Sequence, residues 1–93
     1  AAREVGEPNL VPHPTVLLEN LSQQQKDQIP TIVYTDHVYA EGAAPSVELN
    51  GQRLRLGQRA GAIAVENILV DSVILRVNGV SFRLRALNTW VNL

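Results

Sequence analysis

Two histidines are the residues of this chain best suited to metal binding or acid–base catalysis. His13 lies between Pro12 and Pro14, and His37 follows Asp36 in a segment rich in β-forming residues. The chain has no cysteine, and neither the His-x-His nor the HExxH spacing of zinc sites occurs. We therefore expect no metal and no cofactor, and we interpret His37 as a strand residue hydrogen-bonded to a neighbour or a loop carbonyl.

Four serines are the hydroxyl nucleophiles available, and each has a structural interpretation as a cap, a strand residue or a turn flank: Ser22, Ser46, Ser72 and Ser81. Nucleophilic catalysis needs a base and an orienting group beside the nucleophile. The Gly-x-Ser-x-Gly turn is absent, and Gly57 and Gly61 flank what we interpret as a turn between strands, not a phosphate loop. The sequence predicts that the chain is not an enzyme.

The arginines of the C-terminal half suggest a third kind of chemistry, the binding of phosphate groups, because adjacent strands could bring them together as a basic face. These arginines are Arg53, Arg55, Arg76, Arg83 and Arg85. Such a face can bind a phosphate backbone, but single-strand binders also need aromatic side chains for the bases to stack on. The strand register places Phe82 in the core, and Glu48 opposite Arg53 indicates a charge-balanced surface. We predict no nucleic-acid partner, with a nucleic-acid-binding barrel as a trailing alternative.

The charges divide unevenly between the two halves of the chain. Residues 1–49 carry seven acids against two basic residues, whereas residues 50–93 carry six arginines against two acids, and the net charge is −1. We favour pairing between the halves over steering of a charged partner. A chain of 93 residues that is 45% apolar has the size and composition of one globular domain with a modest core.

The first twenty residues are predicted to be a tether. Pro8, Pro12 and Pro14 favour extended backbone and prevent a helix from starting there. Val16, Leu17 and Leu18 interrupt the polar character, and we expect them to dock on the domain or on a partner. Residues 21–93 would then form a single β-rich domain.

One short helix is expected at the start of that domain, from Leu21 to Pro30. Ser22 is a good N-cap, and Gln25 three residues later completes a capping box. Pro30 ends the helix. Only Leu21 and Ile29 are apolar, so this helix is expected to lean on a sheet with a narrow buried stripe.

Two Asn-Gly pairs predict β-hairpins, because both residues of a type I′ turn need positive φ. With Asn50-Gly51 as the turn, one face carries Val47, Leu49, Leu54 and Leu56. With Asn78-Gly79 as the turn, Val77 pairs with Val80, Leu75 with Phe82, and Val73 with Leu84, while Arg76, Arg83 and Arg85 share the opposite face. Both hairpins therefore separate into an apolar and a polar side, as a defined register requires.

Two further strands complete the fold. Ile32 to Tyr39 is rich in β-branched and aromatic residues. Ala62 to Leu69 alternates with a break in phase that predicts a bulge near Glu66-Asn67, with a short helix as the alternative for this segment. The expected fold is mostly β, with about six short antiparallel strands in two small packed sheets (a sandwich or partly open barrel) and one N-terminal helix. Trp90 in the tail is interpreted as covering the edge of the core, with an interface anchor as the alternative.

The strand from Ile32 to Tyr39 is the candidate binding site, through its exposed edge. Outer strands leave backbone groups unpaired, and a partner strand can satisfy them. The segment follows the helix, lies outside both hairpins, and has apolar or aromatic residues on both faces: Ile32, Tyr34 and Val38 on one, and Val33 and Tyr39 on the other. The residues of the predicted site are Ile32, Val33, Tyr34, Thr35, Asp36, His37, Val38 and Tyr39.

The order of these features resembles the C-terminal periplasmic domain of protein B of the bacterial type II secretion system. A proline-bearing tether precedes a helix that ends Gln-Ile-Pro, and a strand ending His-Val-Tyr precedes the two Asn-Gly hairpins. The resemblance covers roughly residues 20–87. It departs from the family pattern at Ser22, where a proline is usual, and serine caps the same turn.

The resemblance implies a periplasmic homology region, tethered to the inner membrane through a segment upstream of this chain. It implies contact with the periplasmic N-terminal domains of the outer-membrane secretin, and possible contact with other inner-membrane secretion components. The fragment itself is not expected to insert into the membrane, since no apolar run is long enough. The main alternative is a generic β-sandwich or barrel interaction domain of an envelope or regulatory protein, and an enzyme fragment trails it.

Overall fold

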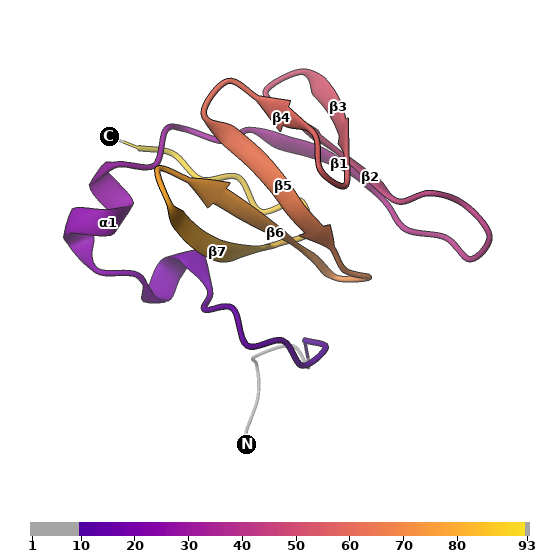
Figure 1. Ribbon diagram of the computed structural model, residues 1–93, viewed down its shortest axis with the longest axis horizontal. Helices are drawn as coiled ribbons and strands as arrows, with labels where there is room; N and C mark the ends of the chain where they lie inside the picture. Colours follow the sequence, from indigo (N-terminus) through magenta and orange to yellow (C-terminus); the bar gives the residue numbers. More distant parts are fainter. Residues whose placement is uncertain (1–9, 93) are drawn as a thin grey trace.

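The computed structural model describes residues 10–92, which form two antiparallel sheets and one short α-helix (Figure 1). The first sheet has the order β1-β2-β3 and the second has the order β4-β5-β6-β7, so each strand pairs with its neighbour in sequence. The strands of the first sheet are β1 (Tyr34–Val38), β2 (Ser46–Leu49) and β3 (Gln52–Arg55). Those of the second are β4 (Arg59–Ala60), β5 (Ile63–Ile68), β6 (Ser72–Val77) and β7 (Val80–Arg85).

The predicted fold class is confirmed: the structure is mostly β, with two small sheets and a short helix. The two sheets do not close into a barrel, because within residues 10–92 no strand of the first sheet pairs with a strand of the second. The strand total is higher than the predicted six, because Arg59–Ala60, interpreted as part of a turn, pairs with Ile63 and Ala64 as β4.

Both hairpins have the predicted register. Val47 faces Leu54, and Leu75 faces Phe82. The left-handed backbone that the turns require is present, with φ of 50° at Asn50 and 52° at Asn78, each followed by a glycine near +80°. Asparagine tolerates this conformation better than most residues, so the two dipeptides fix the strand pairing locally.

The core fills the space between the sheets. Six residues on the predicted apolar faces of the two hairpins are all buried: Val47, Leu54, Val73, Leu75, Phe82 and Leu84. Leu56 was placed on the apolar face of the first hairpin, but it does not enter the core. Its side chain is 58% exposed, because β3 ends at Arg55 and the chain turns away at Gly57, where φ is +85°.

The bulge in β5 is also confirmed. The register of β5 against β6 shifts between Val65 and Asn67. The extra residue lets both Val65 and Ile68 point into the core although they are three positions apart. Glu66, at the bulge, is left on the outer side of the sheet.

The helix α1 spans Gln23–Asp27, within the predicted segment. Its capping box is formed as predicted: the Ser22 hydroxyl accepts from the Gln25 N–H at 3.2 Å, and the Gln25 side chain accepts from the Ser22 N–H at 3.2 Å. Five residues make little more than one turn, and none of them is buried. The helix is held in place instead by Ile29 beyond its end, which is 1% exposed.

The segment before the helix packs on the domain over Val16 to Leu18, one of the two expected outcomes. The Arg83 N–H donates to the Val16 carbonyl at 2.7 Å, and Leu17 makes a parallel bridge with Arg83. Leu18 begins a 3-10 turn, η1 (Leu18–Asn20), and belongs to the core. Residues 1–9 of the predicted tether, and Leu93, lie outside the described residues.

The elements are therefore arranged as two sheets with the chain termini laid along them. In Figure 1 the N-terminal segment runs below β7, and the loop between β1 and β2 extends away from both sheets. Within residues 10–92, no helix is long and apolar enough to cross a membrane.

Candidate functional site

The predicted binding strand lies at an edge of the first sheet, because β1 pairs with β2 alone among the strands. The pairing is antiparallel, with His37 opposite Val47 and Val38 opposite Ser46. Ile32 and Val33 precede the strand and Tyr39 follows it. The site predicted from the sequence is thus a contiguous edge, but its two ends have different surroundings.

The first end is covered by the C-terminal tail of the same chain. The Ile32 N–H donates to the Trp90 carbonyl at 2.7 Å, and the Trp90 N–H donates to the Ile32 carbonyl at 2.9 Å. The Tyr34 N–H donates to the Thr89 hydroxyl at 3.1 Å. A partner strand therefore cannot pair with Ile32 unless the tail leaves.

Trp90 fixes that cover in place. Its indole N–H donates to the Ile29 carbonyl at 3.2 Å, and the ring packs against the core while staying partly exposed. Asn92 adds a side-chain bond to the same carbonyl at 2.7 Å. Trp90 thus covers the edge of the core, as the sequence indicated.

The second end is open. From Thr35 to Tyr39, no segment within residues 10–92 pairs with the outer side of β1. One backbone donor there is already satisfied, since the His37 N–H donates to its neighbour's carboxylate, Asp36 Oδ1, at 2.9 Å. The open part of the edge is therefore short.

A bulge changes which side chains this end presents. The register shifts between Tyr34 and Asp36, so side chains after the bulge point the opposite way from simple alternation. Val38 was predicted to share a face with Ile32 and Tyr34, and this is wrong. Val38 is 37% exposed, whereas Ile32 and Tyr34 are buried in the core.

His37 turns inward at the same bulge and joins the two sheets. Its Nε2–H donates to the Leu69 carbonyl at 2.9 Å, in the turn between β5 and β6. A carbonyl only accepts, so the neutral ring carries its proton on Nε2, and the Tyr34 hydroxyl donates to Nδ1. Burial, and secondarily the charge of Asp36, raise the pKa of the Tyr34 phenol above its usual value. The prediction that His37 is a strand residue bonded to a neighbour or a loop carbonyl is confirmed, and both kinds of bond are present.

An ion-pair network lies on the outer face of the first sheet. Arg53 binds Asp36 Oδ2 at 2.7 Å and reaches Glu48 Oε1 at 3.8 Å and the Ser46 hydroxyl at 3.2 Å. The hydrogen bond from Arg53, and then that from the His37 N–H, lower the pKa of Asp36. The predicted Glu48–Arg53 pair exists, but the closer partner comes from β1. This network joins the acidic and basic halves of the chain.

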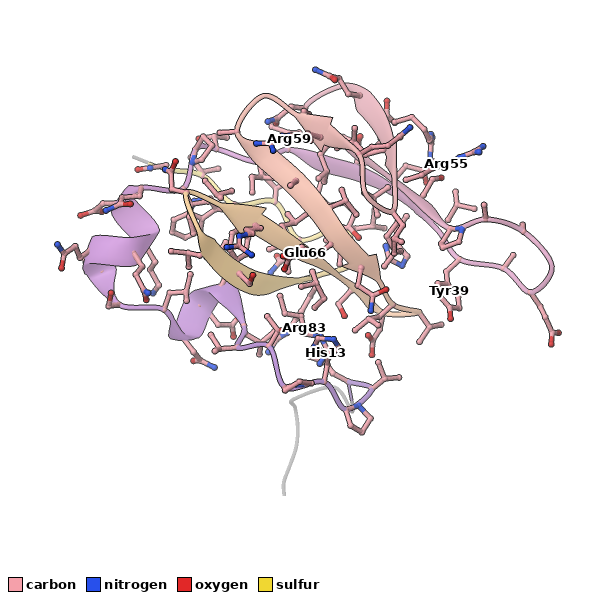
Figure 2. The ribbon with its side chains drawn as sticks, viewed as in Figure 1. His13, Tyr39, Arg55, Arg59, Glu66 and Arg83 are labelled. Carbon is pink, nitrogen blue, oxygen red and sulfur yellow. The ribbon has the colours of Figure 1, made fainter. Side chains whose placement is uncertain are left out.

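A groove that the sequence did not reveal lies where the loop after β1 meets the second sheet. It has a volume of about 520 Å³, and its apolar walls include Tyr39, Pro45, Leu56 and Ile68. Tyr39 and Leu56 are 50% and 58% exposed, and Glu41 stands at its rim. Figure 2 shows Tyr39 at the base of the loop, so the groove adjoins the open end of β1.

The histidines are not gathered with other ligands. His13 Nδ1 accepts from the Thr15 N–H at 3.1 Å, and His37 is engaged by Tyr34 and Leu69. Within the described part of the chain, no three His, Cys, Asp or Glu side chains are arranged to hold a metal ion.

Comparisons with known proteins agree on one family. The family described as "Type II secretion system protein B" matches residues 29–86. The "General secretion pathway protein B" of Klebsiella pneumoniae is 37% identical over 67 residues, which is 70% of this chain and 38% of that protein. The crystal structure of Dickeya dadantii GspB from the type 2 secretion system superposes with a TM-score of 0.59 at 38% identity. The superposed region covers 67% of this chain and 76% of the GspB chain.

Proposed function

The chain belongs to the type II secretion system protein B family, and we propose that it is a protein-binding domain that contacts the periplasmic N-terminal domains of the outer-membrane secretin. The contact helps the secretin to assemble or to stay linked to the inner membrane. The chain spans 38% of the length of the Klebsiella relative, so this role is that of one part of a longer protein.

The observation that carries the proposal is the open end of β1. Unpaired backbone groups at a sheet edge can pair with a strand of another protein, which gives affinity without a deep pocket. The edge is open over Thr35 to Tyr39 and adjoins the apolar groove beside Tyr39. One short added strand buries less than a standard interface, so we expect weak to moderate affinity.

Membership of the family supports a proposal for the location. The domain works in the periplasm, and a segment outside this chain anchors the protein in the inner membrane. Within the described residues, the N-terminal segment pairs with β7 and the Val11 N–H donates to Asp71, so this part of the chain runs beside the second sheet.

Single-cysteine variants test the proposed contact, because the chain has no cysteine of its own. We expect Thr35→Cys and Tyr39→Cys to crosslink with a cysteine in an edge strand of the isolated secretin domains, in a register-dependent way. Val33→Cys, at the end that the tail covers, is the matched control in the same segment and is expected to crosslink less.

Two arginine positions distinguish an edge contact from an electrostatic one. Arg55 and Arg59 are exposed on other strands. If crosslinks form from cysteines at these two positions and not from Thr35 or Tyr39, the strand-edge proposal is wrong.

A further inference from the structure

The outer face of the second sheet, the face turned away from the core, is covered in one half and bare in the other. In the covered half, Ser72, Ile74 and Arg83 are buried although they point away from the core. The N-terminal segment runs beside this half: Val16 and Leu17 pair with the Arg83 backbone at the edge of β7, and the Val11 N–H donates to Asp71 Oδ2 at 2.8 Å. The bare half lies toward β4 and carries exposed charged residues, and nothing in the predicted or proposed function uses it.

Two arginines face each other across the bare half. Arg59 on β4 is opposite Ala64 on β5, and Ala64 is opposite Arg76 on β6, so the three side chains form one row on the same face. Two strand spacings separate the arginines by about 10 Å at the backbone. The small alanine between them leaves a hollow of about 320 Å³, which Asn78 and Gly79 close at the hairpin turn.

The charges in this row are only half compensated. Glu66 Oε2 pairs with Arg76 at 3.4 Å, and its other oxygen accepts from the Ser81 hydroxyl at 2.7 Å. Ser81 therefore holds Glu66 on the β6–β7 side. Among the residues from 10 to 92, no carboxylate lies within ion-pair distance of Arg59. Figure 2 shows Arg59 and Glu66 well apart on this sheet.

We propose that the hollow between Arg59 and Arg76 is a second binding site, which takes a carboxylate from an acidic segment of a partner protein. The guanidinium of Arg59 has the planar fork that binds a carboxylate through two parallel hydrogen bonds. Arg76, held by Glu66 at one side, closes the hollow from the other strand. The carboxylate supplies the counter-charge that the row lacks, and Ala64 leaves the room for it.

An acidic protein segment fits this site better than the other anions. Proteins that bind anionic lipid typically carry a cluster of about four to eight basic residues. The hollow has only two arginines, and the chain has a net charge of −1. Nucleic-acid binding needs stacking aromatics, and no aromatic residue lines the hollow. The lining also has no glycine-rich loop at a helix N-terminus, which is how many proteins bind phosphate.

The site is separate from the edge of β1. Its residues come from β4, β5, β6 and the second hairpin turn, whereas the proposed secretin contact uses β1 and the loop that follows it. Arg55 supplies a matched control. It is also an exposed arginine to which the described structure gives no ion pair, and it lies on β3 of the other sheet.

A titration of the 93-residue chain with a capped tetraglutamate peptide tests the site. NMR signals of the backbone amides and of the arginine Nε–H groups monitor the titration. We expect saturable shifts at Arg59, Ala64, Arg76 and Gly79. Arg59→Ala is expected to weaken the apparent affinity about fivefold, the upper range for one exposed ion pair. Arg55→Ala, with the same loss of charge, is expected to leave it unchanged, and Arg59→Lys to restore it only in part.

Parallel titrations with inorganic phosphate and with phosphatidylglycerol vesicles separate the possible sources of the anion. Tighter saturation by phosphate than by the peptide would overturn the proposal in favour of a phosphate site. Binding to the vesicles alone would overturn it in favour of a lipid surface. Equal weakening by Arg55→Ala and Arg59→Ala would show a general charge effect, and absence of saturable shifts at Arg59 would also refute the site.

Discussion

The outer edges of β7 and β1 are both paired with a terminal segment of the same chain, but they are closed in different ways. At β7, the N-terminal segment pairs with Arg83, whose side chain is 5% exposed and donates to the Ser72 hydroxyl at 2.7 Å and to Asp71 Oδ1 at 3.0 Å. At β1, the C-terminal tail pairs with Ile32 through two backbone bonds, and a partly exposed tryptophan covers the pair.

The difference shows which edge is the more firmly closed. The Asp71 carboxylate also accepts from the Val11 N–H at 2.8 Å, so a single ion pair joins β7, the β5–β6 turn and the N-terminal segment. Opening that edge would remove the Val11 N–H from Asp71 and expose the backbone of Arg83, whose side chain is buried in this ion pair, and weakening a buried ion pair is costly. The cover on β1 ends near Tyr34 and contains no buried charge, and the remainder of that edge has no backbone partner within residues 10–92.

Breaking the β7 closure should have the largest effect on stability. We expect Arg83→Ala to lower the free energy of unfolding by about 2–4 kcal/mol, because it removes a buried side chain and leaves Asp71 with fewer partners. The range is below that for a fully buried pair, since the Asp71 side chain is 28% exposed. Urea denaturation measures the change.

Arg55→Ala is the control for that experiment, as Arg55 is exposed on β3. A surface substitution of this kind is expected to change the stability by no more than about 0.5 kcal/mol. If both variants shift the urea midpoint equally, the buried ion pair between Arg83 and Asp71 does not stabilise the fold as described.

Breaking the β1 closure should have a smaller effect. We expect Trp90→Ala to cost about 1–2 kcal/mol, less than for a fully buried tryptophan, because the ring is only partly buried. The Ile32 amide should then exchange with solvent faster, while the Arg83 amide keeps its protection. Hydrogen exchange by NMR measures both, and equal loss of protection at the two amides would contradict the separation of the edges.

The pH dependence of the β7 closure should be the smallest effect. Burial raises the pKa of Asp71, but hydrogen bonds from the Val11 N–H, the Ser72 hydroxyl and Arg83 outweigh it, so that the pKa is lowered overall. A carboxyl with a depressed folded-state pKa stabilises the fold above its unfolded pKa, near 3.9, and loses that contribution as the pH falls through the folded value.

Asp71→Asn removes this contribution. The variant should therefore be less stable than the parent chain at pH 6, and the difference should shrink by up to about 1 kcal/mol below pH 4. Stability curves at a series of pH values measure it. A difference that grows as the pH falls would have the wrong sign for this interpretation.

The features that the sequence determined are local or periodic. Asn50-Gly51 and Asn78-Gly79 fix two hairpins because few residues tolerate positive φ, and strict alternation then decides which side chains enter the core. The capping box at Ser22 follows from residues three positions apart. The break in phase near Glu66 predicted the bulge in β5 for the same reason.

Only the tertiary structure decided which polar positions are buried and which edge positions are covered. Alternation placed Arg83 on a solvated face, but its side chain is buried and bonds Ser72 and Asp71, while its backbone pairs with the distant Val16 and Leu17. Ile32 is paired with Trp90 at the far end of the chain, and Leu56 is exposed because the strand stops one residue earlier. These outcomes depend on contacts between distant segments, whose choice is made by the packing of the whole domain and leaves no pattern in the local sequence.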